Sequence, residues 1–179
     1  MRYTARDLSI GGLFGALGVA LPILFHVVGL GRAFLPMHLP VLVCGLLVSP
    51  SVSFAVGFVT PVISSALTGM PPLVPTGVLM ALELGALAAV GGVCRRTLRL
   101  PVILSVVVAM TAARLVGGLE LLALAPLMGL KQSFSVYLTQ SVLTSLPGLA
   151  LQIIAAPLVA AAVEGMGRSH HANKIREKQ

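Results

Sequence analysis

The sequence predicts an all-α, polytopic membrane protein with six transmembrane helices and with its N and C termini in the cytoplasm. Three observations predict this fold class. First, 57% of the 179 residues are hydrophobic, and with glycine the apolar share reaches roughly two thirds, against about 45–50% for soluble domains. Second, the apolar residues gather in six runs that are too long and too continuously apolar for barrel strands, so helices must satisfy the backbone in lipid. Third, lysine and arginine lie between the runs in an alternating pattern that indicates membrane topology.

The first two runs differ in length. Leu8–Val28 follows Arg2 and Arg6. Because this run is longer than the apolar part of a signal peptide and lacks an Ala-x-Ala cleavage site, we expect a retained first helix. Leu39–Val48 has ten residues, or about 15 Å of helix, which is too short to cross about 30 Å of hydrocarbon. We expect it to recruit Pro36–Leu39 or to lie as a short, tilted element.

The remaining runs are each long enough to cross the bilayer, and each is closed by helix-breaking or polar residues. They are Val52–Leu67, ended by a proline-rich hairpin; Thr76–Cys94, ended by an arginine cluster; Pro101–Leu124, ended by Ala125-Pro126; and Ser133–Val163. The predicted organisation is one transmembrane domain over residues 1–166 and a polar cytoplasmic tail over residues 167–179.

The basic residues orient the six helices. With the N-terminus inside, the outer loops hold only Arg32 and Lys131, and Arg114 alone lies within a span. The cytoplasmic positions then hold nine lysines and arginines: Arg2, Arg6, Arg95, Arg96, Arg99, Arg168, Lys174, Arg176 and Lys178. Since cytoplasmic loops carry an excess of basic residues, both ends of the chain are predicted to be cytoplasmic.

Polar residues of several spans are predicted at one depth in the outer half. Arg114 lies 13 residues into the fifth helix, and Glu83 and Gln140 lie seven residues below the outer ends of the fourth and sixth helices. All three then sit ~10 Å below the outer edge, above an inner half that is almost purely apolar. This predicts a pocket that opens to the outside, although Glu83 and Arg114 pairing only to join two helices is the alternative. The other predicted pocket residues are Tyr137, Thr144 and His26, with Arg32 and His38 in the outer loop after the first helix. Glu120 is predicted near the outer interface and is not assigned to the pocket.

Small residues recur on the first helix. Gly12, Ala16 and Ala20 follow one another at four-residue spacing, which leaves a smooth strip that another helix can approach closely. This pattern is compatible both with packing of helices within the chain and with docking of another protein. Two proline-rich outer segments, residues 31–40 and 68–75, have few conformations available and are interpreted as lids over the pocket or as ordinary turns.

A family resemblance rests on these two loops and the residues beside them. The residues are Phe34-Leu35-Pro36-Met37-His38-Leu39-Pro40-Val41-Leu42, then Gly45-Leu46-Leu47, then Ser64-Ser65-Ala66-Leu67-Thr68-Gly69-Met70-Pro71-Pro72, then Glu83. Over about residues 5–165 the chain resembles the substrate-binding S component of energy-coupling-factor (ECF) vitamin transporters. The resemblance implies six helices in a bacterial or archaeal cell membrane, a vitamin pocket facing outside, and partnership with a transmembrane coupling subunit and two cytoplasmic ATPases. It also implies that the strip on the first helix docks onto the coupling subunit, and that the whole component topples to carry the loaded pocket inward.

The ligand is less well defined than the pocket. The chain has no tryptophan and two tyrosines, so a box of aromatic rings for a flat heterocycle is poorly supplied. Arg114 suits a carboxylate or phosphate, and Glu83 could take an amine or a hydroxyl. A small carboxylated vitamin such as pantothenate would suit these groups, and folate, cobalamin and queuosine-type precursors remain open.

Two other classes of function compete with this interpretation. A free-standing small secondary transporter should carry polar groups through its inner half or show an inverted repeat, and neither is evident. An intramembrane enzyme needs paired carboxylates, a Ser/His set or a metal cluster at one depth; Glu83 has no second acid predicted at its level, and His26 and His38 lack metal-ligand spacing. The sequence contains no Walker-type loop, so ATP dependence must come from partners. We therefore predict no catalytic residue, no metal and no cofactor.

Overall fold

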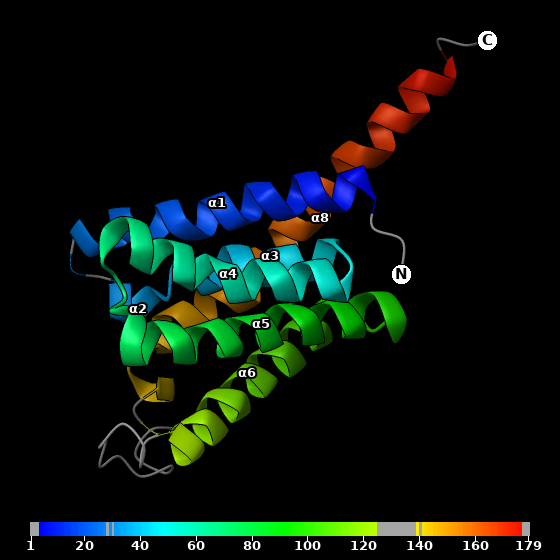
Figure 1. Cartoon of the computed structure of the whole chain (residues 1–179). Helices are drawn as coiled ribbons and strands as arrows, with labels where there is room; N and C mark the ends of the chain where they lie inside the picture. The colour runs from blue at the N-terminus through cyan, green and yellow to red at the C-terminus, as the bar shows by residue number, and fades with distance from the viewer. Residues whose placement is uncertain (1–3, 28, 30, 125–138, 140, 177–179) are drawn as a thin grey trace.

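The computed structural model describes residues 4–27, 29, 31–124, 139 and 141–176, and within these residues the chain forms a bundle of helices without a strand (Figure 1). The elements, in chain order, are α1 (Ala5–Val27), α2 (Gly31–Phe34), α3 (His38–Leu47), α4 (Pro50–Thr68), the π-helical turn η1 (Leu73–Gly77), α5 (Val78–Gly92), the π-helical turn η2 (Val93–Thr97), α6 (Val102–Leu124) and α8 (Leu146–Arg176).

Five helices of the described residues are long and apolar enough to cross a membrane, where the sequence analysis predicted six crossings. The five segments are Ala5–Phe25, Pro50–Thr68, Leu73–Thr97, Val102–Leu124 and Leu146–Gly165. The second predicted run forms only the short helix α3, whose ten residues amount to about 15 Å of rise. The expectation of a short second element is therefore confirmed, and the count of six full crossings is not.

α3 is short because it forms the centre of the bundle. Nine of its ten residues are buried, and α1, α4, α5, α6 and α8 all contact it. A helix that is apolar on every side is typical of a fully buried position. α3 begins at His38, one residue before the predicted run, because Pro40 falls in its first turn, where a missing N–H is tolerated. This earlier start makes His38 part of the buried helix.

The central packing depends on close backbone contact between α3 and α5. A Cβ atom on Gly45 would lie 2.5 Å from the Ala88 carbonyl oxygen and 2.9 Å from the Ala88 Cα. Only glycine therefore allows α3 to approach α5 this closely. Ser53 of α4 joins the same contact, because its hydroxyl donates a hydrogen bond to the Ala88 carbonyl at 3.2 Å.

The last predicted run is interrupted in the structure by a turn. Residues 139 and 141–143 are helical, a turn follows at Thr144 and Ser145, and α8 begins at Leu146, whereas the predicted start at Ser133 lies outside the described residues. Pro147 stands in the first turn of α8, where its fixed φ angle favours helix initiation. The turn before α8 is closed by the Ser145 hydroxyl, which donates to the Ser141 carbonyl. At its other end α8 runs to Arg176, so the described part of the predicted tail continues the helix.

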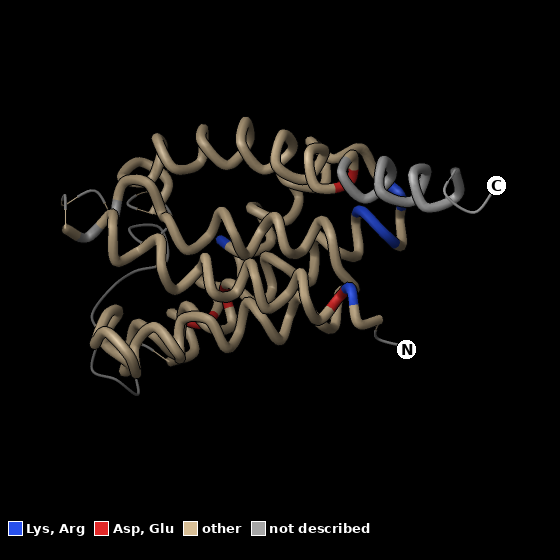
Figure 2. The backbone as a smooth tube through the Cα atoms, turned by 90° about the horizontal axis from the view of Figure 1, so that it is seen from above, with Lys and Arg blue, Asp and Glu red and all other residues tan. Residues whose placement is uncertain are grey.

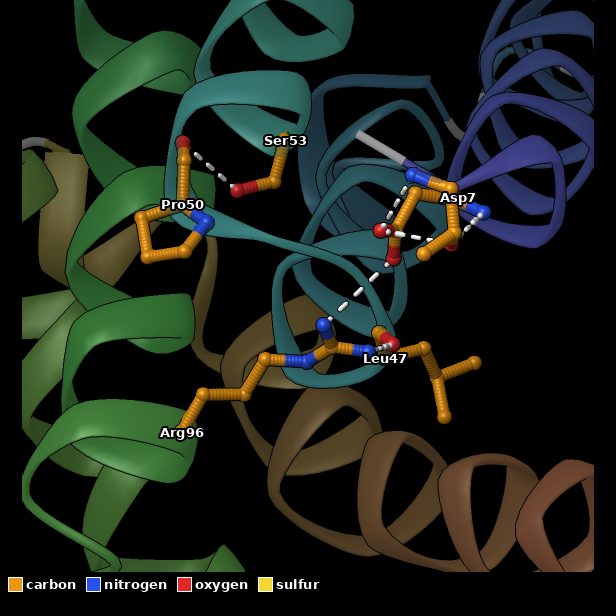
Figure 3. Close-up of polar contacts among 6 residues, drawn as sticks. Asp7, Leu47, Pro50, Ser53 and Arg96 are labelled. Atoms are coloured by element: carbon orange, nitrogen blue, oxygen red, sulfur yellow. Dashed lines mark hydrogen bonds and ion pairs between the residues drawn. The ribbon is translucent and has the colours of Figure 1, made fainter. Parts of the chain in front are cut away.

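Several charged residues lie at the end of the bundle where α1 begins and α8 leaves (Figure 2). There Arg96 of η2 pairs with Asp7 at the start of α1 at 3.4 Å and donates to the Leu47 carbonyl at the end of α3 (Figure 3). The neighbouring Arg95 pairs with Glu164 of α8 at 3.3 Å. This end therefore joins α1, α3, α5 and α8, and it is the end that the topology prediction assigns to the cytoplasm.

Candidate functional site

A cavity of about 630 Å³ lies at the opposite end of the bundle, where the two proline-rich loops meet. The loop between α2 and α3 supplies Leu35, Pro36 and Met37 to its wall. The loop after α4 supplies Met70, Pro71 and Pro72, and the remaining wall residues are Pro22, Gly29, Gly31, His38, Gly69, Thr76 and Met80. Both segments that the sequence suggested as lids or turns thus face one hollow.

The loop after α4 is held in place by hydroxyl groups at the end of that helix. Ser64 donates to the Met70 carbonyl at 2.8 Å, and Ser65 donates to the Pro71 carbonyl at 2.6 Å. Thr68 also donates to the Met70 carbonyl, at 3.0 Å. Gly69 follows in a left-handed conformation with φ of 71°, which glycine adopts without steric cost. The Ser-Ser-x-x-Thr-Gly pattern therefore fixes the loop beside the cavity.

A buried ion pair lies behind the cavity wall. Arg114 of α6 donates to Glu83 Oε1 of α5 at 2.7 Å, and their side chains are 14% and 9% exposed. His38, in the wall of the cavity, places its Nε2 atom 3.7 Å from the same Glu83 oxygen. The imidazole itself has no hydrogen-bond partner at either nitrogen. His38 therefore connects the cavity to two charges that neutralise each other within the bundle.

The structure brings together three of the predicted pocket residues, Glu83, Arg114 and His38. The prediction that His38 lies in an outer loop is wrong, because His38 begins α3 and is only 4% exposed. Thr144 is exposed in the turn before α8. The other predicted pocket residues fall outside what the structure describes: Tyr137 and Gln140 entirely, and His26 of α1 and Arg32 of α2 in their side chains.

Two buried polar residues were not assigned to the site by the sequence analysis. Glu120 of α6, predicted near the outer interface, is 8% exposed, and both of its carboxylate oxygens lack a hydrogen-bond partner. Gln152 of α8 is 1% exposed, and its Nε2 atom has no partner. The sequence feature that could have identified both residues is that each interrupts an otherwise apolar run.

A second hollow, an apolar groove of about 810 Å³, runs along α1 and α4 on the outside of the bundle. Gly12 and Ala16 line it together with Val52, Val56 and other apolar residues of α4. Gly12 is open, since an added Cβ would meet nothing within 4 Å. Ala20 is exposed but does not line the groove.

Other glycines of α1 explain the contact between α1 and α4. An added Cβ on Gly11 would lie 3.2 Å from the Val56 side chain, and one on Gly18 would lie 2.8 Å from Thr60. Gly11 lines the groove as well, so the groove runs along the contact between α1 and α4, and Gly12 remains open beside that contact.

Comparison with protein families gives a match to a transporter family. The model of the family described as "ECF transporter, substrate-specific component" matches residues 6–160, which is most of the 179 residues. No curated protein and no solved structure matches the chain.

Proposed function

The chain belongs to the family of substrate-specific components of ECF transporters, and from this premise we propose that it captures a vitamin or related micronutrient in the cavity between its two proline-rich loops. The family is one of membrane transport subunits that bind substrate, and it is not an enzyme family. The observation that carries the proposal is the cavity itself, because it combines a stiff, apolar wall with a buried imidazole that has no hydrogen-bond partner.

The cavity has the dimensions and the chemistry of a small-molecule site. Ligand pockets have volumes of about 300–1,000 Å³ and are mostly apolar with a few polar groups that orient the ligand, and this cavity measures about 630 Å³. Prolines and the methionines Met37, Met70 and Met80 form much of its wall. Flexible thioether side chains fit irregular apolar shapes. The polar contacts then come from His38 and the charges behind it.

Delivery of the ligand requires partners, because the sequence has no nucleotide-binding loop of its own. We propose that the groove on α1 and α4 docks onto a transmembrane coupling subunit whose two ATPases supply the energy. The support for this step is the uncovered apolar groove that contains Gly12 and Ala16. Close helix approach over small residues is a main mode of helix association in membranes. We propose that ATP hydrolysis topples the component and turns the loaded cavity inward.

The experiment that tests capture is mass spectrometry of small molecules that co-purify with the full chain. Wild type should carry one dominant molecule. The Met80→Trp variant, whose larger side chain would fill part of the cavity, should lose this molecule. Ile103→Trp is the matched control, because Ile103 lies on α6 with 61% of its side chain exposed and should retain the molecule. If wild type carries nothing, or if Met80→Trp carries as much as the control, the cavity is not the binding site.

A further inference from the structure

The described wall of the cavity is rich in methionine and proline. Three of the chain's seven methionines, Met37, Met70 and Met80, lie in it. They come from the loop before α3, the loop after α4 and α5. Met37 is 3% exposed, Met80 is half-buried and Met70 is 54% exposed, so these side chains extend from the buried part of the wall to its exposed edge. Four prolines also line the cavity, and none of the described wall residues is a phenylalanine, tyrosine or tryptophan.

The backbone of residues 70–72, in the loop after α4, has no polar group without a partner in the chain. The two prolines have no N–H, and the Met70 N–H donates to the Thr68 hydroxyl at 3.2 Å. All three carbonyls accept hydrogen bonds. Their donors are the hydroxyls of Ser64 and Thr68 for Met70, the hydroxyl of Ser65 for Pro71 and the Gly77 N–H for Pro72. This loop therefore meets a ligand with the side chains of a methionine and two prolines.

The loop before α3 uses its backbone in the same way. The Leu35 N–H donates to the Gly31 carbonyl at 3.2 Å, and the Leu35 carbonyl accepts from the His38 N–H at 3.0 Å. Pro36, like every proline, has no N–H. The two loops thus offer a ligand mainly apolar side chains, and the polar side chains among the described wall residues are those of His38 and Thr76.

A wall of this kind favours a flat, polarisable group over an aliphatic one. Thioether sulfur makes favourable contacts with the edges of aromatic rings, at about 5 Å from the ring, and the flexible methionine side chain adapts to their outline. Leucine and valine would bury an aliphatic chain equally well, and both are abundant in this sequence. The described wall nevertheless contains one leucine, Leu35, and no valine or isoleucine. Methionine at three positions of this wall therefore points to a ring.

We propose that the ligand of this cavity carries an aromatic or heteroaromatic ring, and that the thioether groups of Met37, Met70 and Met80 contact this ring in place of aromatic side chains. This inference rests on the proposed function and names the class of its ligand. The absence of tryptophan, which on sequence alone made a flat heterocycle a poor candidate, does not count against one if thioethers supply the contacts. Pantothenate, which has no ring, is the candidate that this inference disfavours.

The first test is the chemical structure of the molecule that co-purifies with the full chain in detergent. After release by denaturation of the protein, this molecule should contain an aromatic or heteroaromatic ring, which mass spectrometry and ultraviolet absorbance identify. A co-purified molecule without such a ring overturns this inference and leaves the proposed function standing. If no molecule co-purifies with wild type, the proposed function fails and this inference fails with it.

The second test locates the ring by nuclear magnetic resonance. The chain is expressed in cells depleted of the identified molecule, isotopically labelled at its methionine methyl groups and otherwise deuterated, and then titrated with that molecule. Nuclear Overhauser contacts should join the ring protons to the methyl groups of Met37, Met70 and Met80. Met110 of α6, which packs against the hydrophobic core and does not line the cavity, should show none. An aromatic molecule without contacts to the three methionines overturns the inference.

The third test removes the sulfur atoms. The triple variant Met37→Leu/Met70→Leu/Met80→Leu retains apolar side chains of similar size, an exchange that protein cores tolerate well. It should bind the identified molecule about tenfold more weakly than wild type, because several sulfur contacts with the ring are lost together. Met110→Leu is the matched control and should bind as wild type does. Wild-type affinity in the triple variant overturns the inference.

A folding control accompanies these variants. Thermal unfolding of the full chain in detergent is followed by a thiol-reactive dye that reports the buried thiols of Cys44 and Cys94. Wild type, the triple variant and Met110→Leu should have a similar Tm without ligand, because leucine fills the space of methionine. The loss of affinity then reports contact with the ring and not a change in folding.

Discussion

At the scale of single residues, Glu83 holds the site together, because one of its oxygens is shared by two partners. Glu83 Oε1 lies 2.7 Å from Arg114 and 3.7 Å from His38, and His38 is the partner that faces the cavity. The pair joins α5 to α6, which is the alternative that the sequence analysis gave, and its role in ligand binding, through His38 in the cavity wall, stays a prediction.

Arg114→Ala should reduce the amount of co-purified ligand by more than about tenfold, because it removes the cation that pairs with the buried Glu83 carboxylate and so disturbs His38, which lies beside the same oxygen. The same loss should lower Tm. The double variant Glu83→Gln/Arg114→Gln replaces the ion pair by two neutral amides, so it should recover much of the Tm while ligand binding stays impaired. The measurements are Tm and quantitative mass spectrometry of the bound molecule. Full ligand occupancy in Arg114→Ala would show that the pair is only structural.

The sequence predicts the location of a residue well where a charged residue interrupts an apolar run. It predicts the location poorly where the residue lies next to a helix boundary. Glu83 and Arg114 were expected at one depth because counting residues along two antiparallel helices gives depth directly. His38 was assigned to a loop, because the prolines around it favour a turn as readily as a first helical turn. The burial of Glu120 depends on which neighbours face it, and one sequence does not contain that information.

At the scale of helices, the small residues of α1 lie along its contact with α4. Gly11 and Gly18 admit side chains of α4, and Gly11 lines the open groove together with Gly12 and Ala16. The four-residue spacing predicts a strip that another helix can approach closely, and its use for docking stays a prediction. Spacing alone could not show which of these residues α4 contacts, because that depends on the position of α4.

Ala16→Leu should abolish uptake by whole cells and leave the ligand bound in detergent. The leucine side chain would occupy the groove on α1 and α4, and Ala16 does not line the cavity between the proline-rich loops. The matched control is Ala161→Leu, which adds the same volume to an exposed position of α8 and should leave uptake intact. Uptake is measured with the molecule that mass spectrometry identifies. Normal uptake in Ala16→Leu would show that the docking surface lies elsewhere.

Gly45→Ala should destabilise the protein by about 1–3 kcal/mol, as overpacking of a dense core does, because its Cβ would lie 2.5 Å from the Ala88 carbonyl oxygen. Thermal unfolding with the thiol-reactive dye measures the effect. Gly165→Ala is the control, because an added Cβ there meets nothing within 4 Å and alanine favours a helix over glycine by about 1 kcal/mol. A Gly45→Ala protein with unchanged Tm would mean that α3 and α5 are not in contact as described.

At the scale of the whole molecule, most of the architecture could be predicted from composition and the positions of apolar runs. Four of the five long spans lie within a few residues of predicted runs, because hydrophobic length is a direct signal of membrane crossing. The predicted start of the last run at Ser133 lies outside the described residues; within them, residues 139 and 141–143 are helical and α8 begins at Leu146 after a short turn. The central position of α3 follows from tertiary contacts and could not be predicted from its length alone.

The orientation in the membrane remains a prediction and can be tested by labelling. Thr97→Cys, at the end that carries Arg95 and Arg96, should be protected from a membrane-impermeant maleimide in whole cells and should react after permeabilisation. Thr76→Cys, at the cavity end, should react in whole cells. Both positions are exposed, and the native Cys44 and Cys94 are buried, so background labelling should be small. The reverse labelling pattern would invert the topology.

The neighbouring arginines of η2 have a consequence for how the molecule moves. Arg95 forms an ion pair with the last helix and Arg96 forms one with the first helix, so the short turn η2 connects α1 and α8 at the same end of the bundle. A hinge there would have to break both attachments at once. At the opposite end the described contacts include the Glu83–Arg114 ion pair as well as the loops around the cavity, so the bundle should move as one rigid body, and release of the ligand should require a rearrangement of those loops alone.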